Sequence, residues 1–406
     1  MPAALAIRDV RLLVTAVGLS AVGDFLVWVP LALHVEATTG SAFAVAAFFF
    51  ALFGPSVALA GFAGRLADRV ENARLLVLVS LAQAVAAAAL AFSTGSLAAI
   101  LAFSALLGAG TALSRPPESA LIPAAAGEHV GTANGLVESA RYGGMTAGPV
   151  LGGLLAAAGA LELALLLDAL SFVAVAACAR ALHARRDPRT LTRAAGDSGR
   201  LRDGARHLTG DRVLCVTLAA AIGSLAFFSM SIAAEVIYVK DDLGAGDSAY
   251  GLIMATWFGG MVAGALAVSH RVPVAWHAAG ALAAIAIQGA GIAGATAGAT
   301  LLSAFAGFAV GGAAHGVKNV LLRTLIHERV PAAAMGRAFA AYDGARNAAE
   351  LTALAAAGIV VSLLGCEVAL MLAGGIPLAI GAIALLVVGR RAARAAPRPA
   401  YAGAEP

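Results

Sequence analysis

The sequence predicts an all-α membrane protein with twelve transmembrane helices arranged in two six-helix bundles. Three observations support this fold class: the composition, the spacing of apolar runs and the distribution of arginine. Hydrophobic residues make up 61% of the 406 residues and charged residues only 12%, and the mean hydropathy is +0.89. A soluble domain carries about 25% charged residues. The composition therefore excludes a soluble globular protein.

The apolar runs have the length that a membrane span requires. A helix needs about 20 apolar residues to cross the hydrocarbon core of a bilayer. On this measure the sequence holds twelve candidate spans, at 11–33, 42–62, 75–93, 96–114, 139–159, 161–182, 213–237, 250–269, 275–294, 297–318, 339–361 and 367–389. Turns as short as Gly159-Ala160 join some of them, so successive spans are expected to run antiparallel.

Basic residues gather on one side of this topology. If the N-terminus is cytoplasmic, Lys240 is the only one of the 27 Lys and Arg residues that falls outside. Cytoplasmic loops of membrane proteins carry an excess of Lys and Arg. We therefore expect both termini to be cytoplasmic. The formal net charge of +4 then reflects topology, and no nucleic-acid partner is expected.

A polar, arginine-rich segment separates the first six spans from the last six. We expect an N-terminal six-helix bundle at 1–183, a cytoplasmic linker at 184–212, a C-terminal six-helix bundle at 213–389 and a cytoplasmic tail at 390–406. The segments that enter the fifth and eleventh spans match in register, as in transporters built from two repeats. The matching residues are Gly131, Glu138, Ala140 and Arg141 in the first half and Gly336, Asp343, Ala345 and Arg346 in the second, with Leu121-Ile122 and Leu325-Ile326 upstream.

Charged residues inside spans are costly in a bilayer and are therefore functional candidates. Asp24 in the first span and Glu350 in the eleventh are candidates for proton coupling, and the alternative is a hydrogen bond to another helix. Asp168 and Glu235 are closer to the outer ends of their spans and are expected to face water. A spacing of three residues lets side chains on one helix pair. This spacing predicts two ion pairs at the inner gate, Glu138–Arg141 and Asp343–Arg346.

Aromatic residues could line an apolar substrate cavity. The candidates are Trp28, Phe49 and Trp257, with lipid-facing aromatics as the alternative. The sequence has no Walker loop and no His/Cys cluster with the spacing of metal ligands. We therefore expect no enzyme activity, no cofactor and no metal site.

The charged stretch 64–75, between the second and third spans, resembles a loop of the major facilitator superfamily. The family pattern is Gly-x-Leu-Ala-Asp-Arg-x-Gly-Arg-Lys/Arg-x-x-Leu, and Gly64, Asp68 and Arg69 occupy their places. Glu71–Ala73 stand where the family has glycine and two basic residues, and Arg74 follows one place late. The resemblance implies that the loop ties the first half to the second in the outward-open state. The alternative is a solvated turn whose charges only set topology.

The fifth span carries a second match to this family. The pattern Gly-x-x-x-Gly-Pro-x-x-Gly-Gly is filled by Gly144, Gly148, Pro149, Gly152 and Gly153. In the family it is associated with exporters that work as antiporters. Small residues and a missing backbone donor permit close packing and bending. We expect a deformable seam between the halves, or else ordinary helix packing.

The stretches Gly23–Phe25 and Thr39–Ser41 are similar to those of the macrolide-efflux-type branch of twelve-span drug/proton antiporters. The resemblance implies a monomeric secondary transporter in the bacterial cytoplasmic (inner) membrane. It would export a small, largely apolar, drug- or antibiotic-like molecule in exchange for protons by alternating access. The alternatives are an exporter of an endogenous siderophore or secondary metabolite and, in another class, a transport-inactive membrane scaffold or sensor.

Overall fold

A computed structural model describes residues 3–185, 201–268, 272–331 and 335–395, and this part of the chain is helical apart from its turns. The N-terminal helices are α1 (Arg8–Thr39), α2 (Ala42–Ala58), α3 (Ala60–Arg69), α4 (Asn72–Ala91), α5 (Leu97–Ala126), α6 (Val130–Ala157) and α7 (Leu161–Ala181). The C-terminal helices are α8 (Leu201–Gly210), α9 (Arg212–Phe228), α10 (Ser231–Ile237), α11 (Asp247–Val268), α12 (His277–Ala297), α13 (Leu301–Arg329), α14 (Met335–Leu364) and α15 (Cys366–Ala395). A π-helical turn, Tyr238–Asp242, follows α10. Most of the expected linker and the end of the expected tail lie outside the described residues.

Each predicted span corresponds to one helix or to two successive helices. The second span is α2 with α3, and the seventh is α9 with α10. Nine described helices are long and apolar enough to cross a membrane, or ten when α2 and α3, bent by 54°, count as one span. The helices α6 and α13 have 28 and 29 residues, but their glycines and polar residues make them less apolar. The largest error in a span boundary is at α5, which continues to Ala126 although the sequence suggested an end at 114.

The short link between α1 and α2 shows why the sequence breaks its helices where it does. Gly40 ends α1 in the left-handed region, with a φ of 57°, which a residue with a Cβ adopts at a cost. Ser41 then caps α2, because its hydroxyl accepts a hydrogen bond from the Ala44 backbone N–H at 3.3 Å. Serine is among the favoured residues at this position. The Thr-Gly-Ser sequence is thus a stop signal followed by a start signal.

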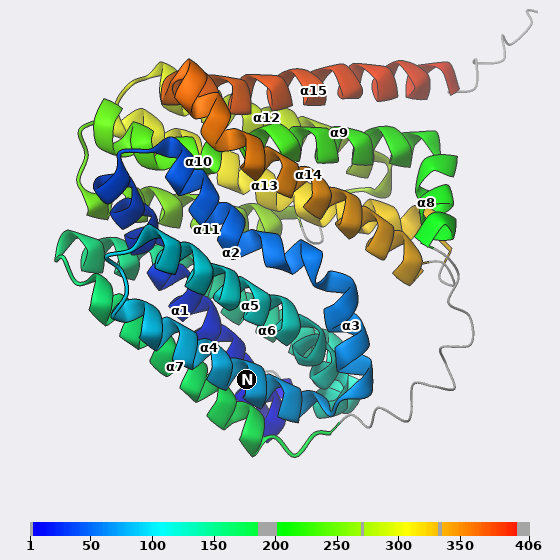
Figure 1. Cartoon of the computed structure of the whole chain (residues 1–406). Helices are drawn as coiled ribbons and strands as arrows, with labels where there is room; N and C mark the ends of the chain where they lie inside the picture. Colours follow the sequence, from blue (N-terminus) through cyan, green and yellow to red (C-terminus); the bar gives the residue numbers. More distant parts are fainter. Residues whose placement is uncertain (1–2, 186–200, 269–271, 332–334, 396–406) are drawn as a thin grey trace, which may run out of the picture.

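The helices form two groups, α1–α7 and α8–α15, here called the N-half and the C-half (Figure 1). The main contacts between the halves are those of α6 with α11 and of α2 with α14. The molecule has two ends (Figure 1). At the basic end α1 begins at Arg8, the chain leaves α7 toward Arg185, and α13 ends at Arg329. At the opposite end α1 ends at Thr39, and the π-helical turn that contains Lys240 follows α10.

Apolar packing differs between the two ends. One large core contains buried residues of both halves, such as Leu90 of α4 and Tyr250 of α11, and lies toward the opposite end. Toward the basic end each half has its own core, around Leu121 in the N-half and around Leu325 in the C-half. Apolar packing therefore joins the halves at the opposite end, whereas at the basic end each half packs on itself.

Glycines bring the backbone of α6 against two other helices. Gly144, Gly148 and Gly152 recur every four residues and face α1; a Cβ on Gly148 would lie 2.7 Å from a side-chain atom of α1. Gly153 faces α11, where a Cβ would lie 3.0 Å from the Cα of Gly251. Most of the predicted seam thus packs within the N-half, and Gly153 contacts the C-half.

Of the four glycines of this pattern, the internal repeat keeps only Gly153, which contacts the other half. When Arg141 is aligned with Arg346, Gly153 falls on Gly358, whereas the three glycines that face α1 fall on alanines at 349, 353 and 357. A Cβ on Gly358 of α14 would lie 2.7 Å from the Cα of Phe43 of α2. Both pairs of helices that join the halves therefore meet at an equivalent glycine.

An ion pair fixes the basic end of the C-half. Asp211 caps α9 by accepting a hydrogen bond from the Leu214 N–H at 3.0 Å, and it also accepts one from Arg329, at the end of α13, at 2.6 Å. Burial acts to raise the pKa of Asp211, but the hydrogen bonds from Leu214 and Arg329 outweigh it and lower this pKa below its usual value. The folded state is therefore stabilised by the ionised form of Asp211.

Substituting Gly153 by leucine should destabilise the protein, because the side chain would enter the contact between α6 and α11. We expect a loss of about 1–3 kcal/mol, the usual effect of overpacking, measured as a lower melting temperature in detergent. Gly143→Leu is the matched control, since Gly143 is exposed on the same helix and a Cβ there meets nothing within 4 Å. Equal melting temperatures for the two variants would contradict a close contact at Gly153.

Asp211→Asn keeps a capping side chain but removes the charge that binds Arg329. Because the folded-state pKa is lowered, the stabilisation is complete above the unfolded pKa of about 3.9 and is lost as the pH falls through the folded value. The free energy of unfolding of the wild type should therefore exceed that of the variant by up to about 1 kcal/mol at neutral pH. This difference should disappear below about pH 4. Melting curves between neutral and acidic pH check this; a difference that does not depend on pH would refute it.

Candidate functional site

The N-half contains a cluster of charged side chains around Asp24. Asp24 of α1, Arg115 and Glu118 of α5 and Arg141 of α6 line one cavity, which also receives polar groups such as Gln83 of α4. Arg141 pairs closely with Glu118, and its Nε lies 3.4 Å from Glu138, the predicted partner. The cavity has about 40 Å³ of free space, which is enough for water. Asp24, which has no basic neighbour in sequence, lies here under the influence of both arginines.

Arg115 and Glu118 were not predicted as site residues. The apolar run predicts an end of the fourth span at 114 and a cytoplasmic loop at Arg115, but α5 continues through Pro116 and Pro117 to Ala126. Prolines lack a backbone donor and often end helices, so this segment resembles a loop in sequence. A signal was present: Arg115 and Glu118 have the same three-residue spacing as Glu138 and Arg141.

The C-half contains a second polar cluster, around Lys318 of α13. Lys318 is only 3% exposed, and its ammonium donates to Gln288 Oε1 of α12 at 3.0 Å. It also lies 3.2 Å from His315 Nδ1. Arg346 and Glu350 of α14 are the charged groups that act on Lys318 over longer distances. The candidate Glu350 thus acts electrostatically on a buried cation, without contacting it.

The predicted ion pair between Asp343 and Arg346 does not form. Within the described part of the chain, Arg346 has no carboxylate within salt-bridge distance, and it donates instead to Asn347 Oδ1 at 3.3 Å. Its Nε is buried and has no hydrogen-bond partner among the described residues. A spacing of three residues permits contact along a helix, but the side-chain conformation decides it, and Arg346 lies with its Nε buried while Asp343 stays partly exposed.

Two further carboxylates are buried, contrary to the expectation that they face water. Asp168 of α7 is 2% exposed and Glu235 of α10 is 4% exposed. Asp168 accepts a hydrogen bond from Ser171 at 3.3 Å and lies against Gly23 of α1, where a Cβ would collide with it. Glu235 accepts one from Ser231 at 2.5 Å. Position along a span does not show which face of the helix packs against its neighbours, and here these faces are internal.

The stretch 64–75 forms the end of α3, a turn and the start of α4. Glu71 caps α4 by accepting hydrogen bonds from the Ala73 and Arg74 N–H groups, both at 3.2 Å, and it lies 3.6 Å from Arg185. Asn72 is completely buried. With its amide nitrogen turned toward the backbone, it donates to the Ala67 carbonyl at 2.7 Å. The residues that depart from the family pattern therefore stabilise the turn.

The residues of this stretch that match the family pattern, and Arg74 one place after it, make fewer contacts. Gly64 has open space around it, and Arg69 and Arg74 are exposed. Among the described residues, no salt bridge joins 64–75 to the C-half. The side chain of Asp68 lies outside the described part. The expected tie between the halves therefore stays a prediction for another conformation.

An ion-pair network joins the halves at the opposite end. Lys240, in the π-helical turn of the C-half, lies 3.3 Å from Glu36 of α1 and 3.2 Å from Asp247 of α11. The sequence placed Lys240 beside Asp241 and Asp242, but its ionic partners come from two helices distant in sequence. Lys240, the basic residue that the sequence places away from the cytoplasmic side, thus connects the N-half to the C-half.

The three aromatic candidates are packed in the core that the halves share. Trp28 lies 5.6 Å from Phe49 and 6.0 Å from Phe258 of the C-half, measured between ring centroids. Trp257 stacks on Phe228 at 4.9 Å and lies 5.5 Å from His315. In this conformation the three side chains fill the core, so their role as the lining of a substrate cavity stays a prediction.

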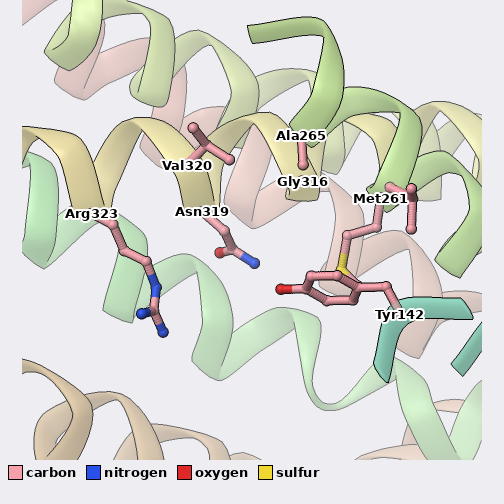
Figure 2. A pocket seen from close by; sticks show the side chains of 8 residues that line it. Tyr142, Met261, Ala265, Gly316, Asn319, Val320 and Arg323 are labelled. Atoms are coloured by element: carbon pink, nitrogen blue, oxygen red, sulfur yellow. The ribbon is translucent and has the colours of Figure 1, made fainter. Parts of the chain in front are cut away.

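A cavity of about 80 Å³ lies between the halves, bounded by α6, α11 and α13 (Figure 2). Met261 and Ala265 form its apolar side. Figure 2 shows Asn319 and Arg323 projecting from α13, with the Tyr142 hydroxyl turned toward the Asn319 amide. This cavity and the one at Asp24 are both smaller than a typical small-molecule site of about 300–1,000 Å³. Neither of these two cavities is large enough for a drug-sized molecule in this conformation.

Comparisons with known proteins agree with this architecture. The model of the Major Facilitator Superfamily matches residues 13–349. The solved structure of the nucleoside transporter NupG, in a mutant form, is similar with a TM-score of 0.77 and 12% identity, covering 93% of this chain and 99% of that one. A POT family transporter in complex with 5-aminolevulinic acid gives a TM-score of 0.72 and 10% identity, covering 94% and 96%.

A bacterial homolog of the human lysosomal transporter Spinster, in an inward-facing and unoccupied conformation, gives a TM-score of 0.65 and 15% identity, covering 95% of this chain and 96% of that one. At these identities the structures establish the fold alone. No curated protein matches the chain. Because the family model covers most of the sequence, the chain belongs to the major facilitator superfamily, and it is a multi-pass membrane transporter rather than an enzyme.

Proposed function

We propose that the chain exports a small, largely apolar, drug-like molecule in exchange for protons. The halves would alternate between a state open at the basic end and a state open at the opposite end. The observation that carries this proposal is that Asp24, a carboxylate within the first span, shares a water-sized cavity with Arg115, Glu118 and Arg141. A titratable acid inside a membrane protein, in contact with space for water, has the chemistry of a proton carrier.

The charge balance of the cluster gives proton binding a structural consequence. With Asp24 ionised, its carboxylate attracts the guanidinium groups of Arg115 and Arg141, which also lie under the influence of Glu118 and Glu138. When Asp24 takes up a proton, this attraction is lost, and in a low dielectric the loss changes the free energy of the cluster. A conformation that separates the arginines or exposes them to water is then favoured. Such a difference between two states is what couples a proton to a conformational change.

The conformation described here fits one state of this cycle. The halves share a core at the opposite end, where Lys240 also binds Glu36 and Asp247, and they pack separately at the basic end. If the basic end is cytoplasmic, as the arginine distribution predicts, this state faces inward. The loop that carries Gly64, Asp68 and Arg69 would then bind the C-half only in the outward-facing state.

The remaining parts of the proposal follow from the family and the sequence. We place the chain in the bacterial cytoplasmic membrane as a monomer, with both termini cytoplasmic. Opening of the shared core would expose Trp28, Phe49 and Trp257 to the substrate. The division into bundles at 1–183 and 213–389, with a linker at 184–212 and a tail at 390–406, would let each half move as a unit.

Asp24→Asn should abolish transport driven by a proton gradient while leaving the fold intact, because asparagine keeps the size and polarity but cannot exchange a proton. We expect the initial rate of gradient-driven dye efflux from vesicles to fall at least about tenfold, to the rate seen with an uncoupler. Glu235→Gln is the control, since Glu235 is a buried carboxylate outside the cluster. Full gradient-driven efflux by Asp24→Asn would refute the proton-carrier role.

Lys240→Gln should shift the protein toward the state that is open at the opposite end. Removing a partly exposed ion pair of about 1 kcal/mol corresponds to a shift of roughly fivefold in the population ratio. Spin labels at Thr38→Cys of α1 and Ser248→Cys of α11, in a chain without its three native cysteines, would report longer distances. Lys240→Arg is the control that keeps the charge. An unchanged distance distribution in Lys240→Gln would show that this network does not hold the end closed.

A further inference from the structure

In each half, a glutamine side chain accepts a hydrogen bond from a neighbouring helix, but the donor is a hydroxyl in one half and an ammonium in the other. Gln83 and Gln288 are each the twelfth residue of their helices, α4 and α12. In the N-half, the hydroxyl of Ser114 donates to Gln83 Oε1 at 3.4 Å. In the C-half, the ammonium of Lys318 donates to Gln288 Oε1 at 3.0 Å. When Leu121-Ile122 is aligned with Leu325-Ile326, Ser114 falls on Lys318.

This equivalence shows that the glutamine does not require a lysine. A hydroxyl is sufficient to satisfy Gln83 in the N-half. The lysine adds a positive charge to a buried place where its structural equivalent is neutral. Burying a charge without a partner is expensive, so a function other than helix packing is needed to explain Lys318.

The C-half also lacks a carboxylate at the position where the N-half has one paired with an arginine. In the same alignment, Glu118 falls on Leu322, which is 1% exposed. Glu118 is the residue that pairs with Arg141 in the N-half, and Arg346 is the equivalent of Arg141 when the segments that enter α6 and α14 are aligned, one place further along than in the alignment of α5 with α13. In the N-half Glu118 binds Arg141 Nη2 and Glu138 binds Arg141 Nε. In the C-half leucine replaces the first acid and Asp343 does not pair with Arg346, whose Nε is buried without a partner among the described residues.

The C-half thus presents two cations that lack a close counter-charge. Within the described part of the chain, neither Lys318 nor Arg346 has a carboxylate within 4 Å, although Glu350 acts on Lys318 from farther away. Their partners are Gln288, His315 and Asn347, which are uncharged or only weakly basic. An anion placed between the two cations would supply the missing charge with charge-assisted hydrogen bonds.

An aromatic surface lies directly beside these cations. His315 Nδ1 is 3.2 Å from the Lys318 ammonium, and the His315 ring is 5.5 Å from Trp257 and 5.9 Å from Phe228. Trp257 and Phe228 stack with an interplanar angle of 12°. One end of the site is therefore cationic, and the adjacent wall is planar and apolar.

A third cation lies between this site and the basic end. Arg323 follows Lys318 along α13 and projects, together with Asn319, into the cavity between the halves (Figure 2). The N-half contributes Tyr142 to the same cavity. An anion that approaches from the basic end would meet Arg323 before it reaches Lys318.

We propose that the transported molecule is an amphipathic carboxylate, whose anionic group binds Lys318 and Arg346 and whose apolar ring packs against Trp257 and Phe228. The proposal rests on the transport function proposed above and specifies the class of its substrate. Gln288 and His315 orient Lys318 for this contact. Binding requires the side chains of Trp257 and Phe228 to rearrange so that the ring of the substrate fits beside them.

The test uses three probes with the same aromatic body and different charge: naphthoate, naphthylmethanol and naphthylmethylammonium. The purified full-length protein in detergent is titrated with each probe, and affinity is taken from the rise in melting temperature, because a ligand of the folded state stabilises it. We expect naphthoate to bind at least about tenfold more tightly than the other two, the difference that one charge-assisted contact provides. Equal affinity for the three probes would overturn the proposal.

Three variants assign the effect to the site. Lys318→Ser copies the arrangement of Ser114 with Gln83 and should weaken naphthoate binding at least about tenfold without changing that of naphthylmethanol. Lys318→Arg keeps the charge and should retain most of the binding. Arg11→Gln removes a distant surface charge and is the control. Naphthoate binding by Lys318→Ser at the wild-type affinity would refute the assignment. If Lys318→Ser does not fold, Arg346→Gln serves in its place with the same expectation.

Vesicle transport separates this inference from the proposed function. Gradient-driven efflux of an uncharged dye that depends on Asp24, without selective naphthoate binding, would overturn the substrate class and leave proton-driven export standing. Naphthoate binding that depends on Lys318, without any gradient-driven transport, would support the anion site and refute the export mechanism. Efflux of naphthoate that requires both Asp24 and Lys318 would support both.

Discussion

A charged side chain inside a bilayer cannot rely on bulk water and must find its partners within the protein. In the N-half this constraint is met inside one cluster, since Asp24 and Glu118 lie with Arg115 and Arg141 around a small cavity. In the C-half it is not met in the same way. Lys318 has polar but no acidic partners at close range among the described residues. The two halves share a repeat but differ in charge, and this difference gives each a separate chemical role.

The contacts between the halves follow a related division. Where the halves must approach closely, both cross-half helix pairs use glycine, Gly153 against α11 and Gly358 against α2. Glycine permits backbones to meet without committing a side chain to one partner. Where the opposite end is closed, the contact is ionic and involves Lys240 with Glu36 and Asp247. Close backbone contacts at glycines, together with an ion pair that can dissociate, would allow the two halves to change their relative orientation.

The departures from the family pattern also have a physical explanation. Glu71 and Asn72 replace glycine and a basic residue, but they cap α4 and bind the end of α3. The altered part of the loop therefore serves local structure. The retained residues Gly64 and Arg69 make little contact here, as expected if their partner is the other half in a different conformation.

The sequence alone determined the helical membrane fold, the approximate spans, the repeat and the candidates Asp24 and Arg141, because apolar length and charge inside spans are properties of neighbouring residues. It misplaced Arg115, whose helix continues through prolines, and it assigned Asp168 and Glu235 to water. These errors have one cause. Which face of a helix is internal, and which distant side chain completes a charge cluster, depends on how helices pack. Only the tertiary structure therefore revealed that Lys318 and the Nε of Arg346 are buried and that neither cation has an acidic partner at close range among the described residues.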